Sequence, residues 1–147
     1  MPTVRDALIG AWRLHSFAFV RVEDGAETFP VGERPQGLLV YTDTGQMSVH
    51  IQRRGRLVAH TDDWAQATPA EIDTAFKGYN GYAGSFAVDE ERGVVVHSVE
   101  LAWFPNFEGS QQTRRYELDG DSLTLCATPR LLAGHLQTTR LVWERML

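Results

Sequence analysis

Cysteine is nearly absent from this chain, and the usual marks of a cofactor site are missing with it. The 147 residues contain a single cysteine, Cys126, which excludes an internal disulfide and a cluster of thiolate ligands. The five histidines show no spacing typical of a metal site, and the sequence has neither a Walker loop nor a dinucleotide-binding glycine fingerprint. We therefore expect no metal and no cofactor.

Basic charge and long apolar runs are also scarce. The formal net charge is -5 and the isoelectric point is near 5.5, which argues against a nucleic-acid partner because such partners need a basic stripe. No apolar run approaches the length of a membrane span, and the first twelve residues lack the apolar segment of a signal peptide. These absences predict a cytoplasmic protein without a nucleic-acid or membrane partner.

Repeats, linkers and low-complexity segments are lacking as well, so we expect one domain over residues 1–147. Most of the chain alternates apolar and polar residues, with breaks at turn signals such as Asp24-Gly25 and Asp119-Gly120. The alternation predicts eight to ten short strands, at residues 10–22, 26–31, 38–42, 47–52, 82–88, 94–103, 111–118, 122–127 and 137–146. Many antiparallel strands in a chain of this length indicate a sandwich or a closed barrel.

Two short helices are expected beside these strands. One covers residues 4–9, near the N-terminus. The other covers about 69–79, where Thr68 is a good N-cap, Pro69 suits the first helical position and Glu71 completes a capping box. Its short apolar stripe suits a helix that lies across another element.

The first strand carries apolar residues on both of its faces. Trp12 and Leu14 share one face, whereas Phe17 and Phe19 share the other. The sequence leaves open which face points inward, and a β-bulge would let the strand switch faces midway.

Two features favour the barrel over the sandwich. Gly10-Ala11-Trp12 resembles the Gly-x-Trp signature of lipocalins, and Arg145 in the last strand would stack on the Trp12 indole to close the barrel base. Further positions match in order along the chain: Arg13, Leu14, Gly37, Leu39, Tyr41, Gly45, Met47, Ser48, Tyr79, Tyr82, Gly84, His97, Val99, Glu100, Phe104, Pro105, Asn106, Gly109, Gln112, Arg114, Glu117, Leu118, Gly120, Asp121, Leu123, Leu141 and Trp143. On these residues the chain resembles the bacterial and fungal lipocalin-like domain family.

The resemblance implies an all-β fold and a ligand. The fold would be an antiparallel, lipocalin-like β-barrel of about eight to ten strands, with the 69–79 helix across one end and a short N-terminal helix. The ligand would be a small hydrophobic or aromatic, polyketide-like molecule in a central cavity, since many such domains accompany specialised metabolism. We expect a monomer or a homodimer.

Three polar residues lie on strand faces that are otherwise apolar. His97 shares its face with Val95, Val99, Leu101 and Trp103, while Gln112 and Arg114 share theirs with Tyr116 and Leu118. A buried polar group is costly unless a partner satisfies it, so the cluster is either a structural network or a binding site.

As a binding site, the cluster would sit in a largely apolar wall. The residues predicted to form that wall are Tyr41, Met47, Val49, Tyr82, Val99, Leu101, Trp103 and Tyr116, with Asn106 at the mouth. Within it, His97 is suited to moving a proton near neutral pH, and Arg114 to holding a carboxylate, enolate or phenolate oxygen. Gln112 would orient the bound molecule.

The sequence supports three functions. The first is a cofactor-independent cyclase, isomerase or lyase of specialised metabolism, with His97, Arg114 and Gln112 as catalytic residues acting on a mainly apolar, oxygenated substrate. The second is a protein that binds or sequesters such a molecule without changing it. The third is a scaffold whose barrel is filled by its own side chains, namely Trp12, Trp103, Tyr116 and Trp143.

Overall fold

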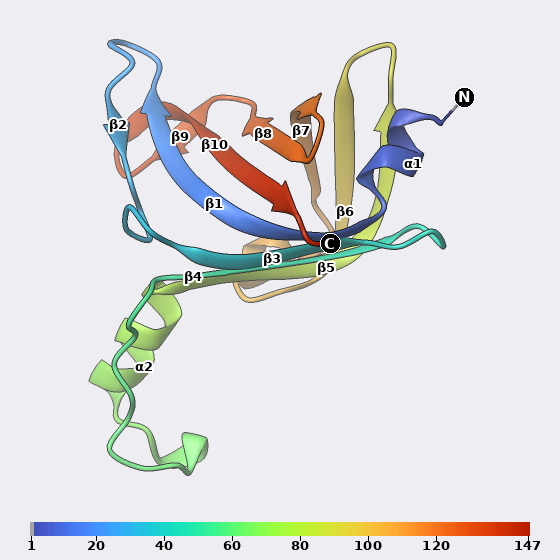
Figure 1. Ribbon diagram of the computed structural model, residues 1–147. Helices are drawn as coiled ribbons and strands as arrows, with labels where there is room; N and C mark the ends of the chain where they lie inside the picture. Colours follow the sequence, from blue (N-terminus) through green and yellow to red (C-terminus); the bar gives the residue numbers. More distant parts are fainter. Residues whose placement is uncertain (1) are drawn as a thin grey trace.

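A single ten-stranded sheet dominates the computed structural model, which describes residues 2–147 (Figure 1). The strands are β1 (Gly10–Arg21), β2 (Glu27–Thr28), β3 (Gln36–Tyr41), β4 (Gln46–Gln52), β5 (Tyr79–Asp89), β6 (Val94–Ala102), β7 (Gln111–Asp119), β8 (Ser122–Ala127), β9 (Arg130–Leu132) and β10 (His135–Arg145). Their order is β2-β1-β3-β4-β5-β6-β7-β8-β10-β9, and every pairing is antiparallel. An additional pairing of β1 with β10 closes the sheet, so the predicted lipocalin-like barrel is confirmed.

Strand β1 closes the barrel because it is long enough to pair on both sides. Its first residues pair with β3, and residues from Trp12 onward pair with β10. The register with β10 shifts between Leu14 and Ser16, which is the bulge that the two apolar faces of this strand allowed. Trp12 and Leu14 are therefore buried before the shift, and Phe17 is buried after it.

The barrel base is closed by the short helix α1 (Val4–Leu8) and the two ends of the sheet. The Trp12 indole donates a hydrogen bond to the Leu8 carbonyl at 2.9 Å. The Arg145 guanidinium lies over the Trp12 ring at 4.3 Å from its centroid and donates to the Ala7 carbonyl at 2.7 Å. The predicted cation–π contact is present, and it joins the first strand to the last.

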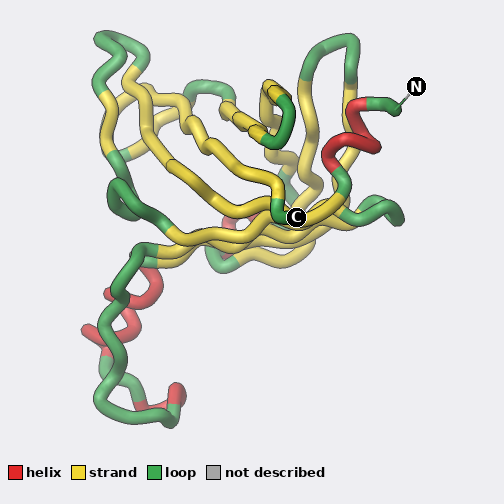
Figure 2. Tube along the Cα trace, in the orientation of Figure 1, coloured by secondary structure: helices red, strands yellow, loops and turns green. Residues whose placement is uncertain are grey.

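The second helix, α2 (Pro69–Lys77), has the predicted start but not the predicted position. It belongs to an arm, residues 53–78, that projects away from the barrel instead of lying flat across its end (Figures 1 and 2). None of its residues is buried, and Phe76 near its end meets Trp103 with 5.5 Å between ring centroids. Phe76 provides most of the apolar contact between α2 and the barrel. Because so little apolar surface of the helix is buried, α2 does not pack across the barrel end.

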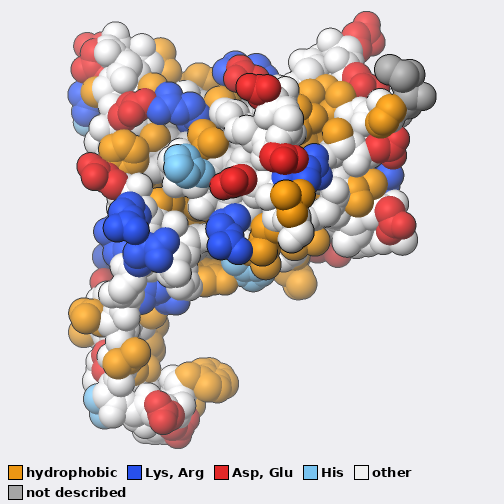
Figure 3. Space-filling view, in the orientation of Figure 1, with side chains coloured by type: hydrophobic (Ala, Val, Ile, Leu, Met, Phe, Trp, Pro, Cys, Tyr) orange, Lys and Arg blue, Asp and Glu red, His pale blue; other side chains and the backbone are white. Residues whose placement is uncertain are grey.

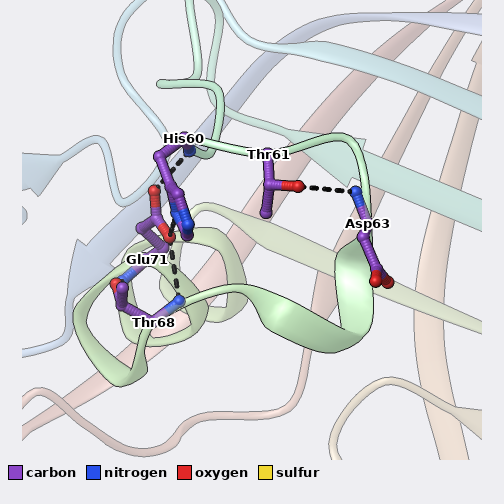
Figure 4. A network of polar contacts seen from close by, with 5 residues as sticks. All are labelled: His60, Thr61, Asp63, Thr68 and Glu71. Atoms are coloured by element: carbon purple, nitrogen blue, oxygen red, sulfur yellow. Dashed lines mark hydrogen bonds and ion pairs between the residues drawn. The ribbon is translucent and has the colours of Figure 1, made fainter.

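The outer part of the arm folds against α2 through polar contacts (Figure 4). The Glu71 carboxylate accepts from the backbone N–H groups of His60 and Thr68, at 2.6 and 2.8 Å, and its other partner is His60 Nδ1 at 2.9 Å. The backbone bond at Thr68, followed by the bonds to His60, lowers the pKa of Glu71 to about 2. Apolar side chains on the arm remain exposed, Trp64 to 87% (Figure 3).

Two short 3-10 helices complete the structure, η1 (Trp64–Gln66) on the arm and η2 (Pro105–Phe107) between β6 and β7. Within residues 2–147, no helix is both long and apolar enough to pass through a bilayer. The hydrophobic core lies inside the barrel, and its largest fully buried side chains are Trp12, Trp143, Tyr41, Leu8, Leu39, Leu123 and Val95.

Candidate functional site

The barrel holds a cavity of about 190 Å³. Its wall is mainly apolar and is built by inward-facing residues of β1, β3, β4, β8 and β10, among them Phe17, Leu39, Ile51, Leu125, Leu141 and Trp143. Leu39 and Trp143 belong to both the core and the cavity wall, so core packing fixes this part of the cavity. The third function considered above, a barrel filled by its own side chains, is therefore not what the structure has.

His97 on β6 is the most deeply buried polar residue of the wall, with 2% of its surface exposed. Its Nε2 lies 2.6 Å from the Tyr41 hydroxyl of β3, and its Nδ1 lies 2.6 Å from the Tyr82 hydroxyl of β5. A neutral imidazole has one donor and one acceptor nitrogen, so one tyrosine accepts a hydrogen bond from the ring and the other donates one to it. The three side chains link three strands.

The surroundings of His97 favour the neutral ring. Burial, followed by the charge of Arg114, lowers the pKa of His97 to about 3. Burial also raises the pKa of Tyr41 and of Tyr82, since a phenolate would lose its water. All three side chains are therefore uncharged at pH 7.

Two guanidinium groups line the cavity beside this network, Arg114 on β7 and Arg130 on β9. Both donate to the same atom, Gln112 Oε1, at 3.3 and 3.4 Å. Gln112 Nε2 in turn donates to Ser110 Oγ at 2.9 Å, which fixes the orientation of the amide. Burial and the nearby charge of Arg114 lower the pKa of Arg130. Gln112 thus positions both arginines.

Three polar atoms of the cavity wall are buried without a hydrogen-bond partner among the described residues. They are Arg130 Nε, Thr139 Oγ1 and Trp143 Nε1. Buried polar atoms in native proteins almost always have a partner, and these three exceptions all belong to residues that line one cavity. Residues 2–147 contain no group of three His, Cys, Asp or Glu placed to hold a metal ion.

The structure brings some of the predicted site residues together and separates others. Tyr82, His97, Trp103, Arg114 and Val49 line the cavity, and Tyr41 and Gln112 contact it through hydrogen bonds to lining residues. Met47 and Val99 are buried in the core, and Tyr116 packs against that core half-buried; none of the three lines the cavity. The prediction that they form its wall is wrong.

Leu101 was also predicted to lie in the wall, and this prediction is wrong. Leu101 is 69% exposed, because the β5–β6 register shifts between Ala83 and Gly84. Gly84 pairs with Val99 and Ala83 with Leu101, so an extra residue turns Leu101 outward. Asn106, which was predicted at the mouth of the cavity, is exposed in η2 and is followed by Phe107, which lines the cavity.

Sequence reasoning missed Arg130, the second cation of the cavity. It lies on β9, which pairs with β10 through a turn at Ala133 and Gly134. Both turn residues have positive φ, 50° and 81°, as a two-residue hairpin of this type requires. Ala is rarely found at such a position, so the sequence carries no Asn-Gly or Asp-Gly signal there. The remaining wall residues that the sequence did not predict are Phe17, Phe19, Leu39, Ile51, Asn80, Phe107, Leu125, Leu132, Thr139, Leu141 and Trp143.

Comparison with known proteins agrees with this architecture. A family model described as a lipocalin-like domain matches residues 9–146. The 4'-hydroxy-3'-methoxypropiophenone carrier protein of Aspergillus oryzae is 28% identical over 107 residues, which cover 68% of this chain and 96% of that protein.

Proposed function

The chain belongs to the lipocalin-like domain family, and from this premise we propose that it is a carrier, which binds a small, mainly apolar, oxygenated aromatic molecule inside the barrel and releases it unchanged. The observation that carries the proposal is the mainly apolar cavity of the barrel, whose lining residues include unpartnered polar atoms. The proposal includes a cytoplasmic setting and a role beside enzymes of specialised metabolism, as the sequence predicts.

The size of the cavity limits the ligand to one ring with small substituents. An apolar cavity of about 150 Å³ in an engineered protein is enough to bind benzene, whereas drug-sized ligands occupy roughly 300–1,000 Å³. A volume of about 190 Å³ lies just above the first of these values. It suits a substituted benzene ring better than a fused polycyclic molecule.

The state of His97 supports a carrier over the cyclase, isomerase or lyase that the sequence also suggested. A general base works best when its pKa lies near the working pH. The pKa of His97 is lowered to about 3, and both of its ring nitrogens are already engaged by Tyr41 and Tyr82. These contacts suit a residue that organises the cavity wall.

The relative from Aspergillus oryzae supports the same class of ligand. It is named as a carrier of 4'-hydroxy-3'-methoxypropiophenone, a single-ring compound with a hydroxyl, a methoxy and a ketone oxygen. Such a molecule combines a mainly apolar body with oxygen atoms that can accept hydrogen bonds from the unpartnered wall atoms.

The experiment uses 4'-hydroxy-3'-methoxypropiophenone as the probe and thermal unfolding as the readout. At a concentration a hundred times the Kd, a ligand that binds only the folded state should raise the Tm by roughly 5–10 °C. Leu125→Trp, which fills the cavity from β8, should abolish the increase. Thr124→Trp, at the neighbouring position on the other face of β8, is the matched control and should keep it.

Two results would contradict the carrier. One is an unchanged Tm at saturating probe together with no binding by calorimetry. The other is an equal increase in Leu125→Trp and in the natural chain, because binding would then lie outside the barrel.

A further inference from the structure

The two arginines of the cavity wall have no carboxylate partner in the part of the chain that the structure describes. Arg114 and Arg130 share the neutral oxygen of Gln112, and the ion pairs within residues 2–147 include neither of them. Two like charges that both donate to one atom repel each other, and their partial burial weakens the screening by water. An amide oxygen balances neither charge. The pair therefore lacks a counterion.

Residues of the same wall also have buried polar atoms that lack a hydrogen-bond partner among the described residues. Arg130 Nε and Trp143 Nε1 are donors only, and both are buried without an acceptor among the described residues. Thr139 Oγ1, also unpartnered, can donate as well. The cavity wall thus has two arginines without a counterion and donors without an acceptor. A negatively charged oxygen would supply both the counterion and an acceptor.

We propose that the cavity binds its aromatic ligand as an oxyanion, a phenolate or an aryl carboxylate, whose charged oxygen accepts hydrogen bonds from Arg114 and Arg130. This inference rests on the proposed function and adds the charge state of the ligand. The ring lies against the apolar wall, where Phe107 already packs under the Arg130 guanidinium at 5.6 Å from its centroid. Gln112 is a positioning residue, since it holds both guanidinium groups and need not touch the ligand.

The other titratable groups that face the arginines keep a constant charge near neutral pH. They are His97 on β6, Tyr41 on β3 and Tyr82 on β5. The pKa of His97 is lowered to about 3, and burial raises the pKa of both tyrosines. Between about pH 6 and pH 9, a pH-dependent affinity would therefore report the titration of the ligand and not of the wall.

The test uses 4-nitrophenol, a one-ring phenol that titrates near pH 7 and whose phenolate absorbs visible light. An opposite charge within a few ångströms lowers the pKa of an acid by about one unit or more, so the phenolate should bind at least about ten times more tightly than the phenol. The absorbance of the bound probe measures this shift directly. 4-Nitroanisole, its methyl ether, cannot ionise and should bind with the same affinity across this pH range.

Variants assign the effect to the arginine pair. Arg130→Gln and Arg114→Gln should each reduce the preference for the phenolate by about tenfold, while 4-nitroanisole affinity stays the same and shows that the cavity is intact. Arg115→Gln is the matched control, because Arg115 follows Arg114 on β7, is exposed and carries the same charge. It should leave the preference unchanged. 4-Nitrobenzoate extends the test to the carboxylate, and a complex tighter than that of 4-nitrophenolate would assign the oxyanion as a carboxylate.

The outcomes separate this inference from the proposed function. If 4-nitrophenol and 4-nitroanisole bind equally at every pH, the oxyanion inference is wrong while the carrier stands. If Arg115→Gln lowers the preference as much as Arg130→Gln does, the effect comes from the overall field and the assignment to the pair fails. If neither probe binds while 4'-hydroxy-3'-methoxypropiophenone does, the oxyanion inference is wrong and the carrier stands, whereas failure of that compound as well contradicts the carrier itself.

Discussion

His97 is a candidate catalytic residue in the sequence, whereas in the structure it joins strands of the cavity wall through hydrogen bonds. A histidine on an apolar face is a candidate acid or base on pattern alone. The structure gives it two tyrosine partners at 2.6 Å and almost no exposure. No sequence pattern could supply this, because Tyr41 and Tyr82 come from strands 56 and 15 residues away.

The buried neutral state of His97 predicts how stability depends on pH. The pKa of this residue is about 3 in the folded protein against an ordinary value of 6.5, so below pH 6.5 the unfolded chain binds the extra proton first. The stabilising contribution is complete above pH 6.5 and is lost as the pH falls toward 3. Across this window the free energy of unfolding should drop by roughly 1.4 kcal/mol for each pH unit through this group alone.

Urea unfolding of the natural chain and of His97→Gln at several pH values measures this contribution. Glutamine does not titrate, so the variant should be less stable at pH 7 yet lose less stability on acidification. Parallel curves for the two proteins would show that His97 does not titrate as a buried neutral group. His15→Gln, which removes an exposed histidine from β1, is the control and should follow the natural chain.

At the scale of elements, the strands were largely predictable and their faces were not. Alternation of apolar and polar residues identified all eight barrel strands, since each must bury one face. Alternation fails at a bulge, because one added residue reverses the faces beyond it. The bulge in β1 explains why the sequence does not settle which face of the first strand points inward. The bulge between β5 and β6 explains the wrong prediction for Leu101.

Gly84 of β5 lies opposite the bulge in β6, whose extra residue is Glu100, and its replacement should be costly. A Cβ atom there would lie 1.9 Å from the Ser98 carbonyl oxygen, which belongs to the backbone and cannot swing away. Gly84→Ala should therefore lower the free energy of unfolding by about 1–3 kcal/mol or more. Gly93→Ala is the comparison, since Gly93 has φ +70° with open space around it and should cost only about 1–2 kcal/mol.

Urea unfolding of both variants tests this account of the bulge. A Gly84→Ala protein that is as stable as the natural chain would show that the two strands are not in close contact there. A glycine inside a predicted strand often marks a bulge, so the sequence itself contains a signal for this one.

At the scale of the whole molecule, the barrel encloses its cavity by closing the sheet and sealing the base. Arg145, Trp12 and α1 join the two ends of the chain at that base. The arm begins next to the cavity wall, where the Trp103 indole, a lining residue, donates to the Phe76 carbonyl at 3.2 Å. Its exposed apolar residues contribute little to the core.

The predictable part of the site was its polar cluster, and the unpredictable part was its size and its second cation. His97, Gln112 and Arg114 follow from alternation on two neighbouring strands. The size of the cavity depends on how side chains from many strands pack at the barrel centre. No local sequence pattern predicts that packing. Arg130 depends on a hairpin whose turn has an alanine at positive φ.

The central claim is that the barrel holds one small aromatic molecule and does not change it. Its most direct test is mass spectrometry of 4'-hydroxy-3'-methoxypropiophenone after incubation with the purified protein, combined with native mass spectrometry of the complex. The account predicts one molecule bound to each chain and recovery of the compound at its original mass. Conversion to a product of different mass or different retention would contradict it, as would a protein that carries none.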